Sequence, residues 1–161
     1  MDLEKADLRG ADLAGTDLEN AILTGANLGK NGTTATDLTG AILTGAQLSK
    51  ADLSGANLAK NGSTATNLSN ADLTGAILTS AVLSDANLTG ANLTGTNLSG
   101  ANLTSTILTG ANLTGADLTG TTLTTIVISG TTNLTSAILV GADLGGDDLT
   151  GVCLLYTSDA A

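Results

Sequence analysis

The chain has 161 residues, of which 21 are glycine, and it lacks proline, histidine, phenylalanine and tryptophan. With 42% hydrophobic residues, 12% charged residues and a net charge of −10, the chain is too apolar to be a disordered tail. Because it has no histidine, it can form neither a Cys/His zinc site nor an imidazole acid–base catalyst. The single cysteine, Cys153, excludes an internal disulfide. Neither a bilayer-spanning apolar run nor a signal peptide is visible, so we expect a cytoplasmic protein that does not contact membranes.

A five-residue repeat runs along nearly the whole chain. Leucine occupies the central place of nearly every unit from residue 3 to 123, and a one-residue shift near Thr131 precedes five more central leucines, the last at residue 154. The consensus is A(D/N)LTG, and 28 of 31 units have a central leucine. The units without a central leucine are centred on Thr33, Ser63 and Ile128.

A period of five excludes long regular elements. On an α-helix, successive leucines would move round the axis by about 140° per unit, and on a flat strand they would alternate between faces. The period predicts a short extended piece with Ala and Leu inward and Asp or Asn outward, followed by a turn that glycine favours. Repeated turning in one sense makes an all-β solenoid.

Several segments resemble the pentapeptide-repeat family, and the resemblance extends over all but about the last seven residues. The segments that carry it include ADLRGADLAG (6–15), ADLSGANLAK (51–60) and ANLTGADLTG (111–120). The resemblance implies a right-handed quadrilateral β-helix with four units per coil, so 31 units would make about 7 to 8 coils. It also implies a bacterial, non-enzymatic structural or protein-binding module.

The repeat predicts one domain over residues 1–154, followed by a non-repeat tail at 155–161. The terminal run CLLYTSDAA breaks the pattern and resembles a translated sequencing-adapter scar, which would make the tail an artefact and the chain a fragment. As a genuine terminus, its apolar residues would instead offer a surface for end-to-end self-association.

No constellation for chemistry appears, so we expect no catalytic residue, no cofactor and no metal site. Outward aspartates recur because the consensus supplies them, and no base accompanies Cys153. The residues expected to form the structural core are Leu8, Leu13, Leu53, Leu73, Leu93 and Leu113.

Two irregular units interrupt the pattern. Residues 26–55 resemble residues 56–85, and each copy places Asn-Gly, a strong turn signal, where the repeat has Ala and Asp or Asn. We interpret them as bulged corners, with a recognition loop as the alternative. The two units are thirty residues apart. If both belong to coils of four units, this distance is one and a half coils, which predicts that they lie on opposite faces of the rod. The predicted bulges are Asn31, Gly32, Asn61, Gly62 and Thr131.

The favoured partner is another protein, and two alternatives stay open. The first is DNA mimicry against a type II topoisomerase, known in the family, although DNA of the rod's length carries on the order of twenty-two charges. Five basic residues gathered near one end are too few for binding nucleic acid itself. The second is an ice-binding surface. Its hydroxyl rows, obtained by stepping twenty residues, would be Thr24, Thr44, Thr64, Ser84, Thr104 and Thr124, and Thr34, Ser54, Thr74, Thr94 and Thr114.

Overall fold

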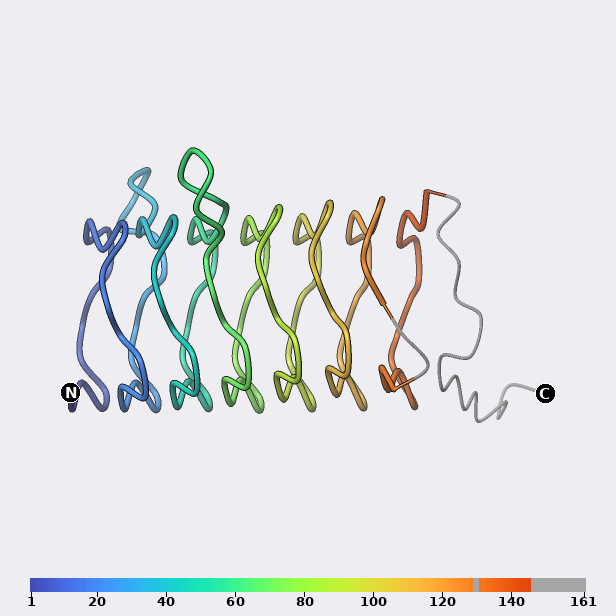
Figure 1. The fold of residues 1–161 in the computed structure, drawn as a ribbon, viewed down its shortest axis with the longest axis horizontal. Helices are drawn as coiled ribbons and strands as arrows, with labels where there is room; N and C mark the ends of the chain where they lie inside the picture. Colours follow the sequence, from blue (N-terminus) through green and yellow to red (C-terminus); the bar gives the residue numbers. More distant parts are fainter. Residues whose placement is uncertain (129–130, 146–161) are drawn as a thin grey trace.

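The computed structural model describes residues 1–128 and 131–145, which wind as successive coils into a straight rod (Figure 1). Within these two ranges the chain has no helix, and therefore none that is long and apolar enough to cross a membrane. The same residues contain no strand longer than one bridged residue. The fold is consequently all-β with very short elements, and in the regular units one residue in parallel bridges is followed by a turn.

Parallel bridges connect the outward residue of each unit to its counterpart in the next coil, and they define four faces. Face A contains Asp2, Ile22, Gln47, Asp72, Asn92, Asn112 and Asn133. Face B contains Asp7, Asn27, Asp52, Ile77, Asn97, Asp117 and Ile138. Face C contains Asp12, Asp37, Asn57, Val82, Asn102, Thr122 and Asp143. Face D contains Asp17, Ile42, Asn67, Asn87, Ile107 and Val127.

The bridge register is not constant along the rod. Bridged partners are 20 residues apart from Asn67↔Asn87 to Ile107↔Val127, but 25 apart wherever residues 31–35 or 61–65 lie between them. Partners on either side of Thr131 are 21 apart, as in Asn112↔Asn133. Four units therefore make a coil, and the two irregular units lie outside it.

A regular corner, without a hairpin, is a turn closed by the core leucine. The Leu3 carbonyl accepts a hydrogen bond from Ala6 N at 3.0 Å, and Lys5 between them has φ of +55°, the third residue of a type II turn. In the described ranges, nine residues other than glycine adopt this left-handed conformation at corners. The leucine N–H then donates to the next coil, for example Leu73 N to the Asn92 carbonyl at 2.8 Å. Local turns and lateral bonds together satisfy the backbone of this unit.

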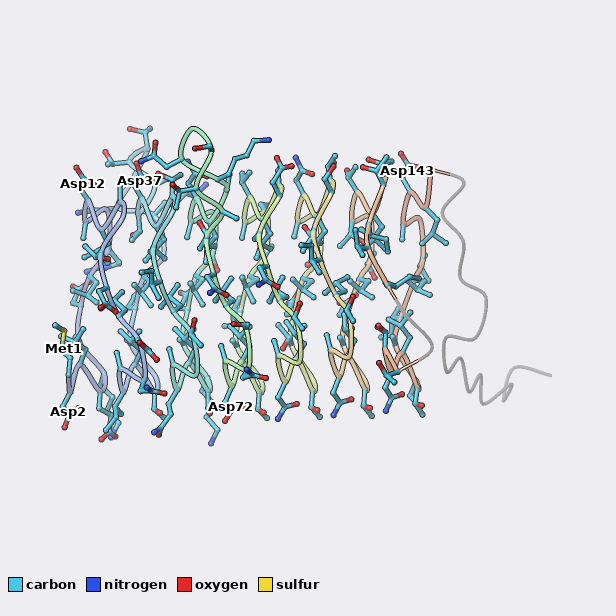
Figure 2. All side chains as sticks on the ribbon, viewed as in Figure 1. Met1, Asp2, Asp12, Asp37, Asp72 and Asp143 are labelled. Carbon is cyan, nitrogen blue, oxygen red and sulfur yellow. The ribbon has the colours of Figure 1, made fainter. Side chains whose placement is uncertain are left out.

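Leucine and alanine side chains fill the interior as stacked rows (Figure 2). The predicted core residues Leu53, Leu73, Leu93 and Leu113 are buried. Leu8 and Leu13, in the first coil, are only partly buried and pack against the same core. Small Ala beside large Leu lets the coils approach to the spacing of about 4.8 Å that β-bridges need.

One imperfection lies in the core near the last described coils. A cavity of about 10 Å³ is lined by ten residues, among them Ile126, Ile128 and Thr132. Ile126 stands in the place that Ala or Thr usually occupies, and Ile128 replaces the usual leucine. Branched side chains therefore do not fill this layer as the regular pair does.

Candidate functional site: two hairpins beside one face

Residues 31–35 and 61–65 form two hairpins that project from the same side of the rod (Figure 1). In the first, Asn31 N donates to the Thr34 carbonyl at 2.8 Å and Thr34 N donates to the Asn31 carbonyl at 3.0 Å. Gly32 has φ of +59°, as the first central residue of a two-residue type II′ hairpin requires. The second hairpin repeats this geometry with Gly62. All five residues of each hairpin are exposed.

The hairpins stand at the two edges of face C. The first separates a unit of face B from the unit of Asp37, and the second separates the unit of Asn57 from a unit of face D. Asp37 and Asn57 are bridged, so their two segments lie side by side on face C. The first hairpin precedes the Asp37 segment and the second follows the Asn57 segment, so the hairpins lie at opposite edges of this face. The prediction of opposite faces is wrong, since a hairpin that leaves the coil adds no quarter turn. Asp12 and Asp37 of face C lie on the hairpin side in Figure 2, and Asp2 and Asp72 of face A lie opposite.

A buried threonine closes the coil behind each hairpin. Thr66, which is 0% exposed, occupies the usual alanine place, donates its hydroxyl to the Ala59 carbonyl at 2.7 Å and accepts from Gly40 N at 2.8 Å. The direct bond from Gly40 N to that carbonyl is stretched to 3.3 Å. Thr36 makes the equivalent contacts with the Gly29 carbonyl and Gly10 N, both at 2.8 Å. In each case the threonine hydroxyl links a glycine N–H to a carbonyl of the neighbouring coil where the hairpin weakens the direct hydrogen bond between them.

Each hairpin folds back over a corner glycine of the preceding coil. A Cβ built on Gly10 would lie 3.0 Å from the Asn31 Cβ, and one built on Gly40 would lie 3.0 Å from the Asn61 Cβ. At Gly115, by contrast, a Cβ would meet nothing within 4 Å. Both hairpins therefore pack on the rod at a place where a side chain would be crowded.

We expect Gly10→Ala to destabilise the protein by about 1–2 kcal/mol more than Gly115→Ala. Both glycines have nearly equal φ, +68° and +65°, so each substitution carries the same left-handed penalty of about 1–2 kcal/mol, and only Gly10 also meets the hairpin. Urea unfolding measures the difference. Deleting residues 31–35 should abolish it, and an equal cost at Gly10 with and without the hairpin would show that the two do not touch.

Charges of both signs surround the hairpins. Lys30 and Lys60 immediately precede them and are exposed. Lys60 Nζ lies 3.0 Å from a carboxylate oxygen of Asp85, and the Lys30 stem lies against Gly55 of the next coil. Both hairpins therefore combine a lysine, an amide and hydroxyl groups in one exposed surface.

Other predicted site features are unremarkable or fall outside the described ranges. Thr131 is exposed and marks the change of register to 21 residues. Among residues 1–128 and 131–145, no three Cys, Asp or Glu side chains gather as a metal site would require. The tail at 155–161 and Cys153 lie outside the part of the chain that the structure describes.

A ladder of side-chain hydrogen bonds runs along face A. Thr94 Oγ1 donates to Asn92 Oδ1 at 2.7 Å and accepts from Asn112 Nδ2 at 3.0 Å. The same pattern recurs at each neighbouring coil, from Asp72 and Thr74 to Asn133 and Thr135. The ladder connects each coil to the next through polar groups outside the core.

Asp72 is the one carboxylate in this ladder. Partial burial would raise its pKa, but hydrogen bonds from the Thr74 hydroxyl, the Ser49 hydroxyl and Thr74 N outweigh burial and lower the pKa below 3.8. A lowered folded-state pKa means that the carboxylate stabilises the fold above pH 3.8 and loses this effect as the pH falls through the folded value.

We therefore expect acidification from pH 7 to pH 3 to lower the free energy of unfolding more in the native chain than in Asp72→Asn. Asparagine suits the site because Asn92 and Asn112 occupy the same place in later coils. Urea unfolding at both pH values measures this. A loss that is as large in the variant would assign the acid sensitivity to other carboxylates.

The hydroxyl rows predicted by stepping twenty residues are wrong over the first half of the rod. The first row is split, with Thr24 on face A, Thr44 on face D and Thr64 in the second hairpin, while its later members lie on face C. In the second row, Thr34 lies in the first hairpin and Ser54 on face B, whereas Thr74, Thr94 and Thr114 share face A. The two hairpins shift the register, so rows continue only beyond residue 66.

The coil of five-residue units with inward Leu and Ala defines a repeat solenoid, and the family follows from the comparison of sequences. The model of the family "Pentapeptide repeats" matches with eight copies, at residues 2–30, 34–60, 64–95 and 86–124. The chain belongs to the pentapeptide-repeat family. The matched segments leave out residues 31–33 and 61–63, at the start of the hairpins.

Among solved structures, the chain resembles HetL, described as a pentapeptide repeat protein involved in heterocyst differentiation regulation from the cyanobacterium Nostoc sp. strain PCC 7120. The identity is 39% and the TM-score 0.86, over 94% of this chain and 65% of HetL. Rfr23 from the cyanobacterium Cyanothece 51142 is 29% identical over 88% of this chain and 89% of its own, with a TM-score of 0.37. QnrB1, a plasmid-mediated fluoroquinolone resistance protein, is 23% identical over 93% of this chain and 80% of its own, with a TM-score of 0.41. No curated protein sequence matches the chain.

Proposed function

We propose that the chain is a non-enzymatic protein-binding solenoid and that the two hairpins beside face C are its contact surface for another protein. The observation that carries the proposal is that two nearly identical exposed segments leave the rod at the edges of one face. Each is held by a buried threonine and packed on a glycine, so each has one defined position before a partner arrives. Preorganised loops lose little conformational entropy on binding.

Site-specific photo-crosslinking tests this proposal. A photoreactive residue at Thr33 or Ser63, in the hairpins, should crosslink the same protein in an extract of the producing cells. The matched control is Thr119, an exposed hydroxyl residue on face B, far from both hairpins. Deleting residues 31–35 and 61–65 should remove the crosslinked partner in a co-purification, because the coil closes without them. Equal products from all three positions, or a partner retained after deletion, would overturn the proposal.

The distribution of charge does not favour the topoisomerase alternative. Acidic residues are spread over all four faces, and the first coil carries one on each: Asp2, Asp7, Asp12 and Asp17. Between residues 86 and 142 the sequence has one charge, Asp117. A DNA mimic needs closely spaced charges along the rod, because duplex DNA has one per about 1.7 Å of axis.

For the whole chain we propose a right-handed quadrilateral β-helix of about 7 to 8 coils, with one domain over residues 1–154. The 20-residue bridge spacing and the four faces support this architecture. Because the two hairpins leave the coil, the count moves to the lower part of that range. A crystal structure of the chain tests the hand and the number of coils. End-to-end self-association, cytoplasmic location and ice binding stay predictions.

A further inference from the structure

The chain has 13 asparagines, and two of them differ from the rest in the residue that follows. Asn31 and Asn61 are followed by glycine, whereas every other asparagine is followed by leucine or alanine. Both lie in the hairpins and are exposed. An exposed Asn-Gly pair has a known reaction path, in which the glycine N attacks the asparagine side-chain carbonyl, and the missing side chain of glycine leaves that approach open.

From this geometry we infer that Asn31 and Asn61 are sites of spontaneous deamidation that requires no enzyme. The Gly32 backbone N, after losing its proton to base, forms a bond to Cγ of Asn31. The Cγ–Nδ2 bond breaks and ammonia leaves with a proton from solvent, which gives a five-membered succinimide. Water then opens the ring at either carbonyl and yields aspartate or isoaspartate. Gly62 and Asn61 react in the same way.

The coil protects the other asparagines because the attacking N–H is already bonded. In ten of the eleven remaining cases, the next residue's N–H donates to a carbonyl, for example Leu93 N to the Asn112 carbonyl at 2.7 Å and Ala71 N to the Leu68 carbonyl at 3.0 Å. In addition, Asn92 Oδ1 accepts from Thr94 N and from the Thr94 hydroxyl, which holds the side chain in place. Attack therefore requires the coil to open locally.

The hairpins leave these groups free. Among residues 1–128 and 131–145, none accepts a hydrogen bond from Gly32 N or Gly62 N, and none bonds the side-chain amide of Asn31 or Asn61. The hairpin bonds involve only the backbone of the first and fourth residues. Folding therefore leaves the reacting atoms accessible at these two sites while it covers them elsewhere.

The reaction changes the charge of the proposed contact surface, although the inference does not depend on a partner. Each event replaces a neutral amide with a carboxylate, so modification at both sites takes the net charge from −10 to −12. The new charges lie one residue after Lys30 and Lys60. The isoaspartate product also lengthens the backbone by one atom within the turn.

The experiment compares the folded full-length chain with the same chain in urea, both incubated at mildly alkaline pH. Digestion and mass spectrometry follow the gain of about 1 Da per site, and isoaspartate is detected by enzymatic methylation. Asn31 and Asn61 should react at about the same rate in both states. Asn70, which precedes alanine, should react about tenfold or more slowly in the folded chain, because its attacking N–H must first be released.

Two variants complete the test. Asn31→Gln with Asn61→Gln should remove nearly all early acidic charge variants on ion exchange, whereas Asn20→Gln with Asn70→Gln should leave them unchanged. If folding slowed deamidation at Asn31 and Asn61 about tenfold or more, the inference would be overturned, since each hairpin would then protect its own asparagine. The same conclusion would follow if the acidic variants persisted after both hairpin asparagines were replaced.

Discussion

Replacing Leu73 with alanine should destabilise the protein by about 3–5 kcal/mol, the upper part of the range for a buried leucine. Leu73 is 1% exposed, and bridges on face A place its unit between those of Leu48 and Leu93, which are also buried. The cavity that the substitution leaves cannot collapse easily, because the 2.8 Å hydrogen bond from Leu73 N to the Asn92 carbonyl and the ladder on face A fix the spacing of the coils.

Urea unfolding followed by far-ultraviolet circular dichroism measures this loss. The dependence of the free energy of unfolding on urea concentration should be compared between the variants, because long repeat arrays need not unfold in one step. Leu8→Ala is the matched control. Leu8 lies in the first coil and is only partly buried, so its replacement should cost roughly 1–2 kcal/mol. Equal costs at the two positions would mean that burial in the rod does not determine the energetic weight of a leucine.

Replacing Thr66 with valine, which has nearly the same shape, should cost about 2–4 kcal/mol. The change leaves the buried Gly40 N–H and the partly buried Ala59 carbonyl with only the stretched 3.3 Å bond between them, and each poorly satisfied group costs about 1–3 kcal/mol. Thr66→Ser keeps the hydroxyl and should retain most of the stability. Urea unfolding provides the comparison.

The control for Thr66 is Thr121→Val. Thr121 is equally buried, but its hydroxyl only donates to the Leu118 carbonyl, which already accepts from Thr121 N. We expect a cost of about 1 kcal/mol there. In a chain without residues 61–65, Thr66→Val should become nearly harmless, because the lateral bond can close. A penalty that survives this deletion would mean that the hydroxyl has another role.

The repeat period was enough to predict the interior and the corners of the rod. Period five admits only an inward Leu and Ala with a turn after them, and the structure has that arrangement from the first coil onward. Glycine was expected at the corners, but Lys5, Asn20 and even the β-branched Thr125 adopt the same left-handed φ. Tertiary packing and lateral hydrogen bonds therefore impose the turn where the residue itself disfavours it.

The irregularity of the two hairpin units could be predicted, but their exclusion from the coil could not, because each has the length of one repeat unit. Residues 31–35 can be counted as a unit without disturbing the period, so the count put them inside the coil and misplaced every row that crosses them. Asn31 stands in the place of alanine and Thr33 in the place of leucine, which is the signal that predicts the irregular unit. A unit with two polar residues at its inward places cannot contribute to an apolar interior.

Because each hairpin leaves the coil and returns to it at the same corner, a corner of the rod is a possible attachment point for an added segment. A segment of five residues added at a corner leaves the inward and outward alternation of later units intact, and the bridge Asp37↔Asn57 keeps its 20-residue spacing between the two hairpins. A protein designer could therefore choose the position of an inserted peptide along the axis by its coil, and its direction around the axis by its corner. In that sense the rod is a scaffold for displaying peptides, and the two hairpins occupy two of its positions.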